Sequence, residues 1–186
     1  MNLKKIARLA IFVLVLLSSC YKNPSTTLLQ QKGKAQTEML QLLQAIDAIG
    51  ELDLAIVKDY IAKAEEFGTH YPEEPMAPDF LYKAGLLAMT VAKTSQSSDE
   101  TAVYTLKALT LFDDIQRIYP DFNGIKNCII NKGMIYDDIL HDYENAEIFY
   151  REFIARYPTD TLAINIESYL PYLGKTPEEI ISELGQ

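Results

Sequence analysis

The residues of this chain that could do chemistry are few and widely spaced. Neither of the two histidines, His70 and His141, has another histidine or a cysteine four residues away, so we expect solvated or capping roles for both. Carboxylate pairs occur at 113–114 and 137–138, but adjacent helical side chains point about 100° apart, which favours a solvated face over a catalytic dyad. The turn 121–124 contains the start of a calcium loop without its later ligands. No serine or cysteine has the surroundings of an activated nucleophile. We therefore predict no enzymatic activity, no metal and no cofactor.

The chemistry that the sequence does predict is at Cys20. A positively charged start at residues 4–8 precedes an apolar run at residues 9–17. This run is too short to span a bilayer core of about 30 Å, which needs roughly 20 residues, and it is typical of a signal peptide at residues 1–19. Leu17-Ser18-Ser19-Cys20 resembles a bacterial lipobox, which implies cleavage before Cys20 and covalent lipid on that residue. The alternatives are an ordinary signal peptide, in which Cys20 is incidental, or an uncleaved anchor.

The charge that remains after such cleavage limits the class of partner. Residues 1–19 hold three basic and no acidic residues, so the formal charge falls from −9 to −12. This acidic body argues against nucleic acid and against general attraction to anionic lipid, which leaves membrane contact to the lipid anchor. Cys128 is the only other cysteine and lies in an apolar helical run, so we expect a buried, unpaired thiol.

The remaining chain has the pattern of an all-α protein. Residues 20–34 are polar with proline and glycine and are interpreted as the lipidated cysteine and its tether, before a helical domain at residues 35–186. Apolar spacing predicts helices at 35–49, from a possible Asp53 cap toward Tyr71-Pro72, at 79–93, from Ser98 or Asp99 to 119, at 125–140, from 142 to the stop at Tyr157-Pro158, at 161–169, and after a Thr176 capping box. No alternating pattern of any length predicts a strand.

Several of these helices share landmarks at fixed offsets. Gly85 and Gly133 each follow a proline (Pro72, Pro120) by thirteen residues, and Ala108 and Ala146 each precede a proline (Pro120, Pro158) by twelve. Small residues let paired helices approach closely, and the terminal proline ends the second helix of each pair. Such self-similarity predicts a short right-handed α-solenoid of helix-turn-helix repeats.

These landmarks resemble the tetratricopeptide repeat over roughly residues 52–171. One unit matches the family at Gly133, Tyr136, Ala146, Tyr150 and Pro158, and the preceding unit matches at Gly85, Ala108, Phe112 and Pro120 with an insertion between its helices. The usual tryptophan is absent. Within that family, Phe153, Arg156, Tyr157, Pro158 and Ala163 resemble the lipid-anchored subclass of the BamD-type outer-membrane assembly lipoproteins. The aromatic residues of the repeats are interpreted as packing between helices.

The resemblance also implies where a partner would bind. In tetratricopeptide repeats the first helix of each pair lines the concave face, which places Tyr82, Lys83, Asn127 and Asn131 there. Asn127 and Asn131 are four residues apart and share a helix face, where they could bond an extended peptide backbone. The alternative is an ordinary polar helix surface.

These observations lead to one functional hypothesis and two alternatives. We expect a lipid-anchored scaffold that faces the periplasm, binds another envelope protein or peptide segment, and possesses no nucleic-acid site. Because Tyr21, not aspartate, follows Cys20, the lipoprotein sorting rule favours the outer membrane. The alternatives are a lipoprotein that binds a small ligand, such as a cell-wall fragment or lipid, and a structural spacer or self-assembling protein.

Overall fold

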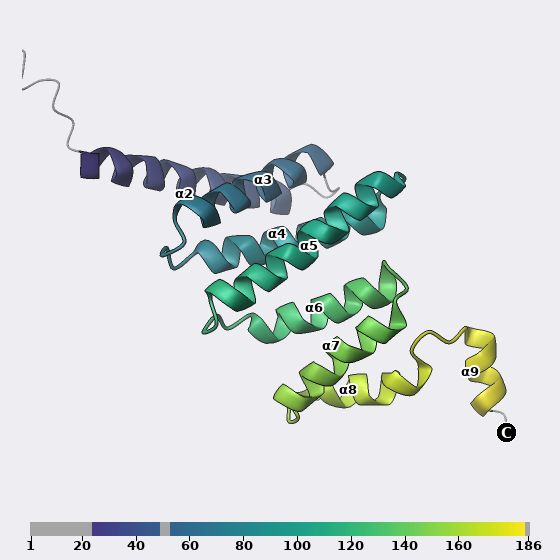
Figure 1. The fold of residues 1–186 in the computed structure, drawn as a ribbon. Coiled ribbons are helices and arrows are strands. Elements are labelled where there is room, and N and C mark those ends of the chain that lie inside the picture. The colour runs from purple at the N-terminus through teal and green to yellow at the C-terminus, as the bar shows by residue number, and fades with distance from the viewer. Residues whose placement is uncertain (1–23, 49–52, 185–186) are drawn as a thin grey trace, which may run out of the picture. The chain divides into compact units, whose positions relative to one another are not determined.

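The computed structural model describes residues 24–48 and 53–184, and every regular element in these ranges is helical (Figure 1). In chain order they are α2 (Pro24–Ala48), α3 (Leu54–His70), α4 (Ala77–Thr94), α5 (Ser98–Ile118), α6 (Ile125–Asp138), α7 (Tyr143–Arg156), α8 (Thr161–Tyr169), the 3₁₀ turn η1 (Leu170–Tyr172) and α9 (Pro177–Leu184). The all-α prediction is confirmed for the described residues. The predicted signal peptide and Cys20 lie outside them.

The first helix is longer than the sequence predicts. It begins at Pro24 instead of near residue 35, so most of the expected tether is helical. Proline is well suited to the first position of a helix, because its fixed φ is helical and its missing N–H would have no partner there. The chain divides into two compact units after Gln41. The first contains most of α2, and the second contains the remaining helices.

Local capping chemistry sets most helix starts. The Asp53 side chain accepts from the backbone amides of Ala55 at 2.9 Å and Ile56 at 3.4 Å, as the sequence predicts. The predicted Thr176 capping box is also present, because Glu179 accepts from the Thr176 amide at 2.7 Å. The cap of α5 is Ser97, one residue before the predicted Ser98 or Asp99. Ser97 is the residue with extended backbone, and its side chain accepts from the third amide of the helix.

The three Tyr-Pro pairs end their helices in the same way. The backbone angles φ and ψ are −134° and 53° at Tyr71, −124° and 61° at Tyr119, and −132° and 53° at Tyr157. Each tyrosine N–H still donates to the carbonyl four residues earlier, but the following proline excludes a helical ψ. The prolines themselves, at 72, 120 and 158, therefore start the turns to α4, α6 and α8.

Within the second unit each helix packs chiefly on its neighbours in the chain. The most extensive contacts join α4 with α5, α6 with α7, and α3 with α4. A Cβ atom added at Gly85 of α4 would lie 2.6 Å from the Phe112 ring of α5, and one at Gly133 of α6 would lie 2.6 Å from the Tyr150 ring of α7. The same close approach thus occurs in two successive helix pairs.

The other repeat landmarks also lie between paired helices or at their ends. Ala108 and Ala146 have no exposed surface, which lets α5 and α7 approach their partner helices. Tyr136 of α6 stacks on Phe149 of α7 with ring centroids 5.5 Å apart. Cys128 is a buried free thiol whose pKa burial raises to about 12, in keeping with the predicted role of a small hydrophobic residue.

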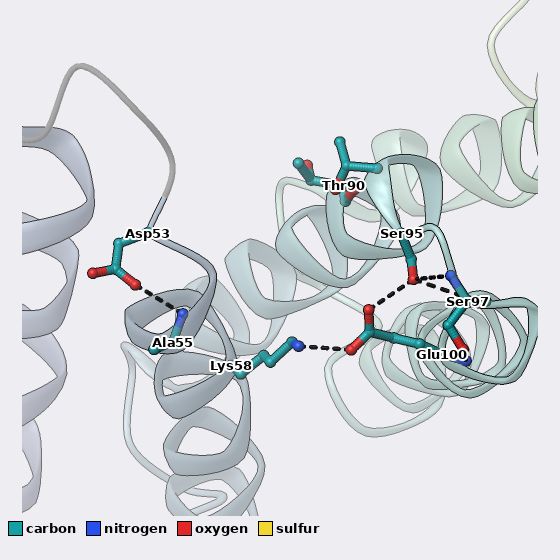
Figure 2. A network of polar contacts seen from close by, with 8 residues as sticks. Asp53, Ala55, Lys58, Thr90, Ser95, Ser97 and Glu100 are labelled. Carbon is teal, nitrogen blue, oxygen red and sulfur yellow. Dashed lines mark hydrogen bonds and ion pairs between the residues drawn. The ribbon is translucent and has the colours of Figure 1, made fainter.

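A polar network fixes α3 against the turn between α4 and α5 (Figure 2). Lys58 on α3 donates to Glu100 Oε1 at 2.6 Å, and the other carboxylate oxygen accepts from Ser95 at 2.7 Å. The Ser97 amide donates to the Ser95 hydroxyl oxygen at 3.1 Å. The hydrogen bonds from Lys58 and Ser95 lower the pKa of the Glu100 carboxyl, so the network is held in its ionised form at neutral pH.

Candidate functional site

The structure brings three of the four predicted concave-face residues together. Tyr82 on α4 and Asn131 on α6 are joined by a hydrogen bond from Asn131 Nδ2 to the Tyr82 hydroxyl oxygen at 3.3 Å. Burial raises the pKa of Tyr82, and hydrogen bonding with Asn131 and Asn127 opposes this shift, so Asn127 belongs to the same cluster. Lys83 lies apart from it, with Nζ 3.9 Å from Asp47 Oδ1.

These residues differ in how far they are available to a ligand. Asn131 is 8% exposed and its amide holds α6 to α4, so it acts as a junction between helices. The Tyr82 ring is 6.0 Å from the rings of both Phe112 and Phe122, which fix its position. Asn127 and Lys83 are only half-buried. They are therefore the two members of the set best placed to contact a partner.

The contact between α4 and α6, here called the α4–α6 seam, also includes an ion pair, and a second ion pair joins α6 to α5. Lys93 near the end of α4 donates to Asp138 of α6 at 2.7 Å. Lys132 of α6 pairs with Asp113 of α5 at 2.6 Å, and its ammonium lies 4.4 Å from the centroid of the Phe149 ring. Asp113 and Asp138 are exposed and engaged by lysines, which agrees with the prediction of a solvated face for these two carboxylates.

The prediction is wrong for Asp137, which is buried and only 8% exposed. Its Oδ2 accepts hydrogen bonds from the hydroxyls of Tyr150 at 2.9 Å and Tyr169 at 2.8 Å. These bonds join α6, α7 and the end of α8. Burial, reinforced by the Asp137 charge, raises the pKa of Tyr150 and brings that of Tyr169 to about 12, so both phenols remain donors at neutral pH.

A pocket of about 370 Å³ lies beside this carboxylate. It is lined by Lys93, Asp137, Asp138, His141, Tyr143, Tyr169, Gly174 and Lys175. Side chains of both charges therefore face the same small space. The sequence contained no signal for it, because its lining comes from four separate segments and Asp137 is brought to Tyr169 only by the packing of α8.

The histidines take the capping roles that the sequence predicts. His70 and His141 are both exposed, and the Nδ1 atom of each lies within hydrogen-bonding distance of the carbonyl four residues earlier, at 2.9 Å and 3.1 Å. His141 has φ of 51°, which turns the chain between α6 and α7. Among residues 24–48 and 53–184, no group of three or more histidine, cysteine or acidic residues is placed to hold a metal ion.

Comparison of the chain with protein-family models, curated proteins and solved structures finds no significant match. None of the helices in the described part of the chain combines the length and apolarity needed to cross a membrane.

Proposed function

We propose that this chain is a lipid-anchored scaffold of the bacterial envelope, built as a short right-handed solenoid of tetratricopeptide-like repeats. The observation that supports it most is the repeated contact of Gly85 with Phe112 and of Gly133 with Tyr150. The glycine and the aromatic residue occupy the positions at which that repeat packs its two helices together. The identical backbone of the three Tyr-Pro helix ends adds independent support.

The scaffold would bind a protein segment across α4 and α6, at Asn127 beside the contact between these helices and at Lys83, which lies apart from that contact on α4. Lys83 and Asn127 offer a cation and an amide, which can bond the carboxylates and backbone of an extended peptide. Such a groove needs no catalytic group and no cofactor. The BamD-like sequence features favour a partner in outer-membrane protein assembly, with the scaffold held at the periplasmic face by lipid on Cys20.

The anchor and the partner are tested separately. Cells fed radiolabelled palmitate should label the wild-type chain, whereas Cys20→Ser should remain unlabelled and lose its outer-membrane fractionation. An unlabelled wild-type chain contradicts the lipoprotein assignment.

For the partner, the full-length chain is affinity-purified after reversible crosslinking in cells. The variants Lys83→Glu and Asn127→Arg are compared with Arg151→Glu, an exposed change on α7. We expect the first two variants, but not the third, to lose the partner.

A second candidate function is the binding of a small cell-wall fragment. The pocket of about 370 Å³ supports it, because Lys93, Lys175 and Asp138 present both charges to a zwitterionic ligand. A thermal-shift screen with peptidoglycan fragments and lipids tests this alternative. A rise in melting temperature that Lys175→Ala abolishes would favour it over the scaffold.

A further inference from the structure

A larger pocket lies at the opposite end of α4, outside the α4–α6 seam. Its volume is about 510 Å³, within the usual range for ligand sites. Figure 1 shows that the start of α4 and the turn from α5 to α6 lie at the same edge, on the left of the view. The lining is apolar at Pro75, Pro78, Ile118, Tyr119, Pro120 and Phe122, and polar at Asp79, Asp121 and Asn123. Ile118 is 42% exposed, so its side chain is open to a ligand.

The charged side chains that line this pocket are all acidic. Asp79 and Asp121 are both exposed at its rim, and no lysine or arginine belongs to the lining. In the part of the chain that the structure describes, no ion pair neutralises either carboxylate. A third carboxylate, Glu73, is close enough to Tyr119 to raise the pKa of its phenol, although burial contributes more. The pocket is therefore complementary to a cation.

Tyr119 supplies the second observation. Its hydroxyl is shielded from solvent and has no hydrogen-bond partner among the described residues. A buried donor without a partner destabilises a protein, because the group loses its hydrogen bonds to water and gains none. The raised pKa of the phenol keeps it protonated at neutral pH. Because this hydroxyl is shielded from solvent, a carbonyl oxygen of a ligand can reach it only after the Tyr119 ring turns toward the pocket, where the phenol would gain the partner that it lacks.

We propose that this pocket binds an arginine-containing segment of the partner protein, with an apolar residue next to the arginine. The guanidinium would pair with Asp79 and Asp121, and the apolar neighbour would pack on the prolines and Phe122. Once turned toward the pocket, the Tyr119 hydroxyl would donate to a backbone carbonyl of the segment. This inference rests on the proposed scaffold function and adds to it the chemistry of the partner. It also makes the α3–α4 and α5–α6 turns a second recognition surface.

The test compares two peptides that differ only in charge. Lipidated full-length chain with ¹³C-methyl isoleucine is titrated with N-acetyl-Pro-Phe-Arg amide and with its citrulline analogue, and the Ile118 methyl resonance is followed. Two exposed ion pairs predict that the citrulline peptide binds between about 2-fold and 30-fold more weakly. Asp79→Asn and Asp121→Asn should each reduce this difference. Glu167→Gln, which removes an exposed carboxylate on α8, should preserve it.

Tyr119→Phe separates a binding role from a structural one. It keeps the ring and removes the unpaired hydroxyl, so we expect a higher melting temperature together with peptide affinity about 2-fold to 10-fold lower. Equal binding of the two peptides, or Tyr119→Phe affinity equal to that of wild type, overturns the inference. If spermidine displaces the peptide and binds with the same affinity as the peptide, the inference is also overturned, and the pocket is a site for a small cation. If the peptides do not bind but the crosslinked partner is still lost in the Lys83 and Asn127 variants, this inference is wrong and the scaffold function stands. If the peptides bind as expected but crosslinking in cells captures no partner, only the scaffold function is contradicted.

Discussion

Gly85→Ala tests the close helix packing on which the proposed repeat architecture depends. The added Cβ would lie 2.6 Å from Phe112 Cε1 and 2.9 Å from Cζ, well inside ordinary van der Waals contact. Because Phe112 is fully buried, its ring has no open space to enter. Overpacking of this kind costs about 1–3 kcal/mol, and the better helix propensity of alanine returns about 1 kcal/mol. We expect a net loss of up to about 2 kcal/mol in the free energy of unfolding.

Gly33→Ala is the matched control for this substitution. Gly33 is also helical, but a Cβ there would meet no atom within 4 Å, so we expect stabilisation of α2 by about 1 kcal/mol. Urea unfolding followed by circular dichroism measures both variants. Phe112→Leu provides a further check, since the smaller side chain should make Gly85→Ala less costly in that background. If Gly85→Ala stabilises the protein as much as Gly33→Ala does, the close approach of α4 and α5 is refuted.

Three other substitutions or conditions probe the buried polar groups. Asp137→Asn should lower the free energy of unfolding by about 1–3 kcal/mol, because a neutral amide oxygen accepts more weakly from Tyr150 and Tyr169 than the carboxylate does, and the new NH2 group is buried; urea unfolding measures this, and an unchanged midpoint contradicts it. The melting temperature measured against pH should be constant below pH 10 and should fall toward pH 12, because the pKa of Tyr169 is about 12 in the folded chain against about 10 in the unfolded chain. A melting temperature that does not change between pH 10 and pH 12 would contradict the burial of the Tyr169 hydroxyl against Asp137. Thr105→Val should stabilise the protein by about 1 kcal/mol in the same urea assay, since the Thr105 hydroxyl is buried without a partner; a destabilised variant would indicate a bond to a group outside the described residues.

The sequence predicted the helices well where local chemistry decides them. Asp53 and the Thr176 box cap their helices through side chains within three residues, and each Tyr-Pro pair ends a helix through a steric effect on one residue. The start of α2 was less predictable. Its first eleven residues are mostly polar, and Leu28 and Leu29 alone make no apolar stripe, so their helicity depends on propensity and on Pro24 rather than on a pattern.

The site was harder to predict, because it depends on contacts between distant segments. The adjacent carboxylates 137 and 138 look alike in sequence, yet one pairs with Lys93 and the other is buried beneath two tyrosines. Which of the two turns inward is set by the rotation of α6 against α7 and α8. The pocket at Tyr119 has the same origin, since its walls come from the start of α4 and from a turn about 40 residues later. Spacing within one helix carries no information about such contacts.

The central claim is that the α4–α6 seam binds another envelope protein. Site-specific photocrosslinking in living cells tests it most directly, with benzoylphenylalanine at Lys83 or Asn127 of the full-length chain and at the exposed Arg151 of α7 as the control. The account predicts one discrete adduct with the same envelope protein from both seam positions and none from the control position. The absence of adducts from the seam, or equal adducts from all three positions, would contradict it.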